Sequence, residues 1–263
     1  MATPWVCLMY HDIALNEAGS GGGPARFAVP IAEFRRQLDQ LRDEGYAGHS
    51  LRAALQPGAE RVVAITFDDG DTGQFERGFR ALAERGMTAT FFVTTDWIGR
   101  SGYVSWDQLR EMRAGGMEVQ SHSRSHPFLS ELGAADVTAE LRGSKETLDA
   151  GLGQNTDMLA LPGGDWPRRA LRHLIAAAGY RVVATSRWGT NSPPPAAAGV
   201  LPPVLRCTIQ GEPGSEGFRR IVAGDVALGR QRRIREDTLG MLRGALGPSR
   251  YASWRKVVLD ALG

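Results

Sequence analysis

The fold can be predicted from residues 61–70, which read Arg-Val-Val-Ala-Ile-Thr-Phe-Asp-Asp-Gly. The part that ends at Phe67 is mostly apolar and rich in β-branched residues, which is typical of a buried strand. Asp68, Asp69 and Gly70 follow directly. Adjacent carboxylates at a strand end repel each other and lose solvation, so they favour a bound cation or a shared proton. Taken alone, the segment is also compatible with a simple acidic turn closed by glycine.

Short apolar runs of this kind alternate with amphipathic helical stretches along the chain. We predict strands at residues 5–10, 61–67, 88–94, 117–121, 158–161, 181–185 and 204–209. Helices are predicted at residues 31–41, 75–85, 106–113, 137–148, 168–178, 239–246 and 251–262. Repeated strand–helix units indicate a largely parallel sheet, and about six to eight of them suggest a closed or nearly closed (β/α) barrel.

Neither a linker nor an internal repeat divides the chain, so we expect one domain over residues 1–263. A catalytic core is expected at about residues 5–210 and a helical extension at about 215–263. Cys7 and Cys207 lie among apolar neighbours and are expected to be free, buried thiols.

The charge balance excludes some partners. With 31 basic and 29 acidic residues, the formal net charge is +2, which is too even to favour nucleic acid or a membrane surface. No run approaches the roughly 20 apolar residues of a membrane-spanning helix. The first residues lack the basic segment and long apolar run of a secretory signal. We therefore expect a cytoplasmic protein.

Two of the five histidines, His122 and His126, lie four residues apart just after the predicted strand at 117–121. Such a pair can meet on one side of a turn, as imidazole ligands of a divalent metal must. Structural histidines are the alternative for the pair alone. Together with Asp68 and Asp69 the metal prediction becomes strong, because two imidazoles and one carboxylate leave a position for water and substrate.

These segments resemble known motifs. Residues 66–70 resemble the first motif, and residues 122–127 the second motif, of the polysaccharide deacetylases (the NodB-homology group, carbohydrate esterase family 4). The resemblance spans roughly residues 5–210. It implies a distorted (β/α) barrel of the NodB-homology type, here with extra C-terminal helices, and metal-dependent removal of acetyl groups from an N-acetylated sugar or glycan. By the same resemblance Asp69, His122 and His126 bind a divalent metal, most simply zinc, with cobalt or nickel as alternatives, and Asp68 is the general base.

A third motif is incomplete. Residues 159–164, Leu-Ala-Leu-Pro-Gly-Gly, resemble the family's Arg-x-Pro-x-Gly loop, whose backbone N–H after the proline helps to hold the oxyanion. That group would be Gly163, although a plain Pro-Gly-Gly turn is also possible. Ala160 stands where the family has an arginine that orients the base, and Arg187 or Arg206 could replace it. Trp166 could stack on a sugar ring.

The usual late histidine, the family's general acid, is missing. Beyond residue 126 the chain has only His173, which lies within a predicted helix. His11 follows the first predicted strand, and its surroundings resemble the Tyr-His element of a circularly permuted branch that includes the poly-β-1,6-N-acetylglucosamine deacetylases. The resemblance gives His11 the acid role. A barrel makes this plausible because its first and last strands are neighbours.

Two other functions stay open from the sequence. The same fold could remove a formyl group from a lipid-linked sugar or hydrolyse a cyclic amide, although the intact Asp68–Asp69 pair favours deacetylation. The missing arginine and late histidine also allow a catalytically inactive carbohydrate-binding domain.

Overall fold

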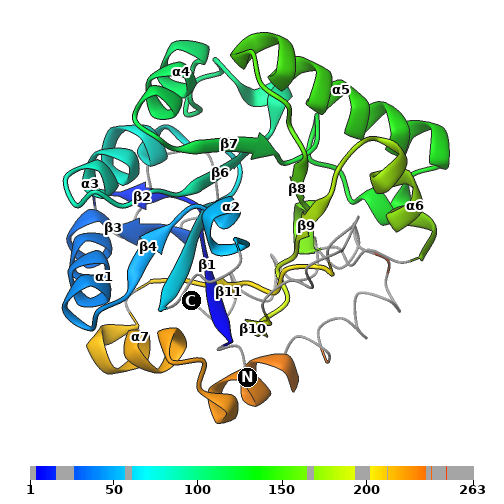
Figure 1. The fold of residues 1–263 in the computed structure, drawn as a ribbon. Coiled ribbons are helices and arrows are strands. Elements are labelled where there is room, and N and C mark those ends of the chain that lie inside the picture. Colours follow the sequence, from blue (N-terminus) through cyan, green and yellow to red (C-terminus); the bar gives the residue numbers. More distant parts are fainter. Residues whose placement is uncertain are drawn as a thin grey trace, which may run out of the picture.

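A curled sheet of nine strands occupies the centre of the molecule (Figure 1). This computed structural model describes residues 4–15, 27–56, 61–164, 169–192, 202–211 and 213–234, together with Thr238 and Gly247. The strands of the sheet are β1 (Trp5–Tyr10), β4 (Ala47–His49), β5 (Val62–Phe67), β6 (Thr90–Val93), β7 (Glu118–Ser121), β8 (Met158–Ala160), β9 (Val182–Ala184), β10 (Thr190–Asn191) and β11 (Cys207–Thr208). A separate two-stranded sheet joins β2 (Ile13–Ala14) to β3 (Val29–Pro30).

The order of the main strands is β10-β1-β5-β6-β7-β8-β9, with β4 beside β5 and β11 beside β1. Its pairings are parallel except for β10, which runs antiparallel to β1. Ala184 of β9 forms a parallel bridge with Val204, and Cys207 then pairs with Leu8 of β1. The segment 204–208 therefore links the last strand of the sheet to the first. The distorted (β/α) barrel predicted from the sequence is confirmed.

Helices surround this sheet (Figure 1). They are α1 (Ile31–Asp43), α2 (Leu51–Ala54), α3 (Arg80–Ala83), α4 (Trp106–Ala114), α5 (Ala134–Leu152), α6 (Arg169–Ala177) and α7 (Gly214–Val222). Within the predicted C-terminal extension, α7 and helical residues 226–234 are described, whereas the helices predicted at 239–246 and 251–262 lie outside the described residues. Among the described residues, no helix combines the length and apolar character needed to cross a bilayer.

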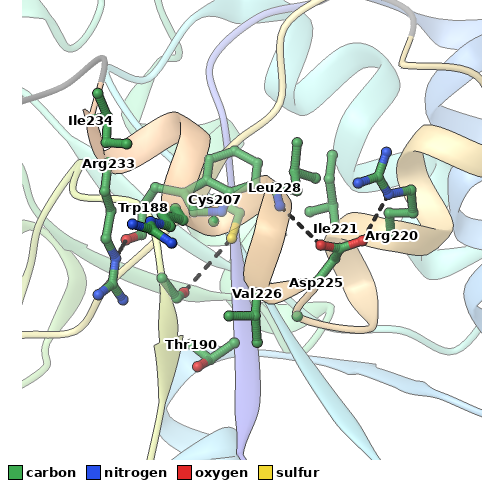
Figure 2. A pocket seen from close by; sticks show the side chains of 14 residues that line it. Trp188, Thr190, Cys207, Arg220, Ile221, Asp225, Val226, Leu228, Arg233 and Ile234 are labelled. Atoms are coloured by element: carbon green, nitrogen blue, oxygen red, sulfur yellow. Dashed lines mark hydrogen bonds and ion pairs between the residues drawn. The ribbon is translucent and has the colours of Figure 1, made fainter.

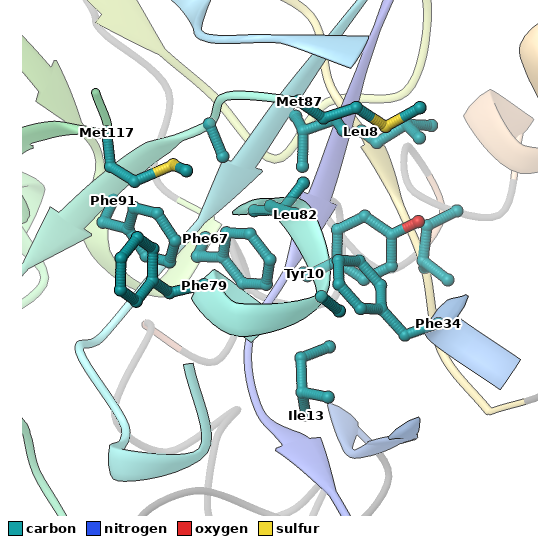
Figure 3. Close-up of a cluster of buried hydrophobic side chains, with 14 of the residues drawn as sticks. Leu8, Tyr10, Ile13, Phe34, Phe67, Phe79, Leu82, Met87, Phe91 and Met117 are labelled. Atoms are coloured by element: carbon teal, nitrogen blue, oxygen red, sulfur yellow. The ribbon is translucent and has the colours of Figure 1, made fainter. Parts of the chain in front are cut away.

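The largest hydrophobic cluster packs between the outer face of the sheet and its helices (Figure 3). Phe67 and Phe91 stack with their ring centroids 4.6 Å apart, and Tyr10 packs edge-to-face on Phe34 at 5.1 Å. All four side chains are fully buried. Burial of each large apolar side chain contributes about 1.5–3 kcal/mol. This packing fixes the strands whose carboxyl ends carry the polar residues.

The inner face of the sheet is different. It carries mainly small apolar side chains, and Ala64, Ala160 and Ala184 belong to one buried cluster with Phe92. Arg206, which is fully buried, places its guanidinium over the Phe92 ring, 5.6 Å from the ring centroid.

Local structure departs from the sequence predictions at several places. The predicted strands after the first are each shortened, most of all 204–209, where only Cys207–Thr208 forms a strand. The predicted helix 75–85 begins with a π-helix, η2 (Gln74–Phe79), which continues into α3. Just before this helix, a Cβ on Gly73 would come within 2.4 Å of the Ile13 carbonyl oxygen, so the chain approaches β2 more closely than a side chain would permit.

Candidate metal centre and catalytic residues

The candidate site lies at the carboxyl end of the parallel strands, as expected for a sheet of this kind. Asp68 and Asp69 follow β5, His11 follows β1, and His122 follows β7. Backbone hydrogen bonds hold these strand ends together: the Asp68 N–H donates to the Tyr10 carbonyl oxygen at 3.0 Å. The barrel thus gathers residues that are as much as 111 positions apart, from His11 to His122.

Asp69, His122 and His126 converge on one point. One ligand atom from each lies within 4.8 Å of the others, and they form the single group of this kind in the part of the chain that the structure describes. Asp69 Oδ1 is 3.3 Å from His122 Nε2 and 3.4 Å from His126 Nε2. A tetrahedral zinc ion about 2.0–2.1 Å from its nitrogen and oxygen ligands keeps those atoms about 3.3–3.4 Å apart. The three side chains are therefore spaced as ligands of one small divalent ion.

The surroundings of the two imidazoles suit ligation. His122 Nδ1 lies 3.0 Å from the carbonyl oxygen of Ala160, so Nδ1 carries the proton and Nε2 presents its lone pair. The His126 N–H donates to Ser123 Oγ at 3.1 Å. Asp69, Ser123 and His126 all adopt positive φ, at 80°, 65° and 65°. Non-glycine residues rarely take this conformation outside sites where the surroundings impose it.

Electrostatics also favours a cation here. Burial opposes ionisation of Asp69, but its contacts with His122 and the nearby imidazoles hold its pKa well below the ordinary value. Burial and the neighbouring His122 lower the pKa of His126 to about 4, so its imidazole is neutral, as a metal ligand must be. Burial would lower the pKa of His122, but Asp68 and Asp69 raise it. Burial and the Asp69 charge raise the pKa of Asp71 to about 8, which leaves Asp71 uncharged at neutral pH.

Asp69 Oδ1 is buried and has no hydrogen-bond partner among the described residues. An orphaned carboxylate oxygen facing two imidazole nitrogens is costly unless a cation occupies the space between them. The residues present therefore fit the divalent metal predicted from the sequence.

Asp68 faces a different partner from its neighbour Asp69. Arg206 donates from Nη1 to Asp68 Oδ1 at 2.6 Å and from Nη2 to Oδ2 at 2.7 Å. The same guanidinium donates through Nε to the Thr185 carbonyl oxygen and through Nη1 to Thr66 Oγ1. Burial alone would raise the pKa of Asp68, but Arg206 and then His122 lower it. Asp68 is thus an ionised carboxylate that still has free lone pairs, since the bidentate pair uses one on each oxygen.

Between the two arginines left open by the sequence, the structure places Arg206 on Asp68, while the Arg187 side chain is exposed. The predicted strand at 204–209 contains Arg206, whereas in the structure Arg206 directly precedes β11 and enters the barrel from the segment that links its edges.

His11 lies at the same mouth. Its ring stacks on Phe27 with centroids 4.5 Å apart, and its Nδ1 is buried without a hydrogen-bond partner among the described residues. Burial lowers the pKa of His11, an effect that the Asp69 and Asp68 charges oppose.

Gln74 is a residue of this site that was not predicted from the sequence. Its Nε2 donates to the backbone oxygens of His11 at 3.0 Å and Asp68 at 2.5 Å. Sequence alone gave no sign of this, because Gln74 is one polar residue at the start of a helix.

The remaining predicted residues are placed as follows. Gly163 lies in η5 (Pro162–Gly164), directly beyond β8, with a φ of 64°. A Cβ there would meet the Phe128 ring at 2.2 Å, so glycine is required. Trp166 lies outside the described residues. His173 is exposed on α6, in agreement with its having no predicted role.

A separate cavity of about 350 Å³ lies against α7 and helical residues 226–234 (Figure 2). Trp188, Cys207 and Asp225 are among the residues around it. None of the predicted catalytic or metal-binding residues lines it. The candidate site at the strand ends is therefore separate from this cavity.

Comparison with known proteins agrees with this geometry. Residues 56–183 match the family model described as polysaccharide deacetylase. YxkH of Bacillus subtilis (strain 168), a provisional polysaccharide deacetylase, is 31% identical over 192 residues, which cover 70% of this chain and 65% of that protein. A chitin deacetylase of Colletotrichum lindemuthianum is 34% identical over 120 residues, covering 45% of this chain and 44% of the other. The chain thus spans 44–65% of the length of these two curated relatives.

Among solved structures, the Streptococcus pyogenes deacetylase PplD in complex with acetate is 27% identical, with a TM-score of 0.74. The match covers 84% of this chain and 99% of that chain. The barrel is therefore of the NodB-homology type that the sequence predicted. The circularly permuted branch stays a prediction.

Proposed function

We propose that this chain, a member of the polysaccharide deacetylase family, is a metal-dependent hydrolase that removes N-acetyl groups from an amino sugar or glycan. One observation carries the proposal. A three-ligand site of Asp69, His122 and His126 lies beside Asp68, a carboxylate that Arg206 holds apart from the ligands. Three ligands leave a coordination position open, and the neighbouring carboxylate can accept a proton.

Each residue has a role in this proposal. A divalent ion bound by Asp69, His122 and His126 would polarise the acetyl carbonyl and make a water molecule more acidic. Asp68 accepts the proton of the attacking water as general base. Arg206 keeps Asp68 ionised and directs its free lone pairs toward the mouth of the barrel. The positively charged guanidinium makes Asp68 a weaker base than a free carboxylate, so the base acts only on an already acidic water.

His11 is the proposed general acid that protonates the departing amine. Its position after β1 and its buried Nδ1 support this role. A lowered pKa makes the imidazolium a stronger proton donor, although a smaller share of His11 is protonated at neutral pH. The Gly163 N–H is the proposed donor to the oxyanion, supported by its place just beyond Ala160, whose carbonyl oxygen contacts His122.

The substrate class rests on the relatives. One is named a chitin deacetylase, and the PplD structure holds acetate, the product that this reaction would release. Both support an N-acetylated sugar or glycan as substrate. Zinc as the native metal and a cytoplasmic location stay predictions. An inactive carbohydrate-binding domain is the weaker alternative, since such a domain has no physical need for both a complete ligand set and a paired base.

Metal removal tests the proposal. Protein purified without chelator should contain about one zinc, cobalt or nickel ion per chain and release acetate from N-acetylglucosamine oligomers. Dialysis against a chelator should abolish acetate release, and added zinc should restore it, because the three ligands alone do not activate water. Circular dichroism of the metal-free protein controls for unfolding. Full activity of folded, metal-free protein would contradict the proposal, and release of formate from a formylated sugar would indicate the deformylase.

His11→Ala should lower kcat about 10²–10⁴-fold, the usual contribution of a general acid. Metal content should be unchanged, because His11 is outside the ligand group. His173→Ala, at an exposed position on α6, is the matched control and should retain wild-type turnover. Wild-type turnover in His11→Ala would show that another group is the general acid.

A further inference from the structure

The segment between the two predicted imidazole ligands is short and conformationally unusual. Ser123, Arg124 and Ser125 separate His122 from His126, and both Ser123 and His126 have a φ of 65°. The backbone does not favour this conformation by itself. Contacts from neighbouring elements must therefore hold the loop if His126 is to stay beside Asp69.

One side chain contacts this loop from the neighbouring helix α5. Glu140 Oε2 accepts the backbone N–H groups of Arg124 at 3.0 Å and of Ser125 at 2.9 Å. Its Oε1 accepts from Ser125 Oγ at 2.7 Å. Hydrogen bonds to an ionised acceptor are shorter and stronger than neutral ones. A single carboxylate thus binds three donors of the loop that joins the two ligands.

The helix that carries Glu140 is a rigid support. Val137 and Leu141, on either side of Glu140 in the sequence, are buried in a hydrophobic cluster with residues of β8 and α6. Ser144 Oγ lies 2.8 Å from Ser121 Oγ, so α5 is also tied to the end of β7. Glu140 therefore ties the loop to a helix that is itself fixed by packing.

On its other side the loop contacts Thr95 and Asp96, partly through the Arg124 side chain, whose Nε donates to Asp96 Oδ2 at 3.4 Å. The N–H of Asp96 donates to the Arg124 carbonyl oxygen at 2.9 Å. The N–H of Thr95 donates to the Ser123 carbonyl oxygen at 3.3 Å. His122 has its own fixed bonds to Val93 and Ala160 and does not depend on the loop. The His126 N–H donates to Ser123 Oγ within the loop, and the His126 ring also stacks on Trp97 with centroids 5.1 Å apart.

We propose that Glu140 is a positioning residue for the metal site, which holds the 123–125 loop so that His126 Nε2 stays within ligating distance of the ion bound by Asp69 and His122. This inference rests on the proposed function only in requiring a divalent ion at that place. Glu140 is not one of the three residues that could hold the ion. It sets the affinity for the metal through His126.

The test is the dissociation constant for Zn²⁺, measured by competition with a chromophoric chelator on the whole chain. Glu140→Ala should weaken zinc binding about 10–100-fold, the usual effect of removing an outer contact of a ligand. Glu140→Gln should be affected less, because its amide oxygen can still accept the two N–H groups. Glu146→Ala, an exposed glutamate on the same helix, is the matched control and should bind zinc like wild type. The thermal midpoint of the metal-free Glu140→Ala protein should match that of the control.

A second measurement separates positioning from general loosening. In a His126→Ala background, Glu140→Ala should cause no further loss of zinc affinity, since its effect passes through His126. An equal loss in both backgrounds, or a zinc dissociation constant of Glu140→Ala within twofold of the control, would overturn the inference. If the wild-type protein itself binds no divalent ion, the proposed function fails and not merely the role of Glu140.

Discussion

Asp68→Asn is expected to lower kcat for acetate release about 10²–10⁴-fold, because an amide cannot accept the proton of the attacking water. Metal content should stay near one ion per chain, since the ligand group is Asp69, His122 and His126. Acetate release and metal analysis on the same preparation measure both outcomes. Loss of the metal in Asp68→Asn would show that Asp68 is a ligand and overturn the division of roles between the two aspartates.

Unfolding could imitate this loss of activity, because Asp68→Asn leaves the buried Arg206 charge without its carboxylate. Removing one partner of a buried ion pair costs about 3–5 kcal/mol, whereas replacing both partners by uncharged groups is often close to neutral. The double variant Asp68→Asn with Arg206→Met is therefore the control. It should regain much of the lost stability and remain inactive.

Arg206→Met is expected to have the largest effect on stability. Both side chains are buried, with Arg206 0% and Asp68 2% exposed, so the variant leaves a charged carboxylate in the barrel without compensation. The free energy of unfolding at pH 7, measured in urea, should fall by about 3–5 kcal/mol. Arg187→Met, at the other arginine considered from the sequence, should lower it clearly less, because the Arg187 side chain is exposed. A cost for Arg206→Met no larger than that for Arg187→Met would contradict the assignment.

The loss of stability in Arg206→Met, relative to the wild type, should depend on pH in a definite direction. In the wild type, Arg206 holds the folded-state pKa of Asp68 below its unfolded value of about 3.9. The pair therefore stabilises the fold above that pH, and the contribution is lost as the pH falls through the folded-state pKa. In Arg206→Met the buried carboxyl has a raised pKa and takes up a proton as the pH falls. The difference between variant and wild type should be greatest at pH 7 and shrink toward pH 4.

Much of the candidate metal centre was predictable because its signals are local in the sequence. Asp69 ends a strongly apolar strand, and His122 and His126 lie in one five-residue segment after another strand. The structure brings these three together with ligand spacing, as expected. Strand ends in a parallel sheet share one edge, so no knowledge of the loops was needed.

The partner of Asp68 could not be chosen from sequence. Arg206 is 138 positions away from Asp68, and its approach depends on how the segment 204–208 joins the two edges of the barrel. Nothing in the local pattern separates it from Arg187. Its guanidinium lies over the ring of Phe92, which belongs to the same buried cluster as Ala160 and Ala184. Ala160, the alanine that breaks the family motif, thus belongs to the cluster whose Phe92 ring contacts the Arg206 guanidinium.

Other contacts were missed for related reasons. Gln74 and Glu140 are polar residues on helices, where most such side chains only meet solvent. Their importance arises from tertiary contacts with strand ends and with the ligand loop. The short strands β4 and β10 have three and two residues and carry no recognisable period. Barrel geometry, not local propensity, makes them strands.

Anomalous diffraction from zinc-loaded crystals tests most directly whether one ion is held by Asp69, His122 and His126 with Asp68 outside its coordination. We predict one zinc peak per chain, about 2.0–2.1 Å from His122 Nε2, His126 Nε2 and an Asp69 carboxylate oxygen, with both Asp68 oxygens still paired to Arg206. Absence of a peak between these side chains, or a zinc ion coordinated by Asp68, would contradict this ligand set.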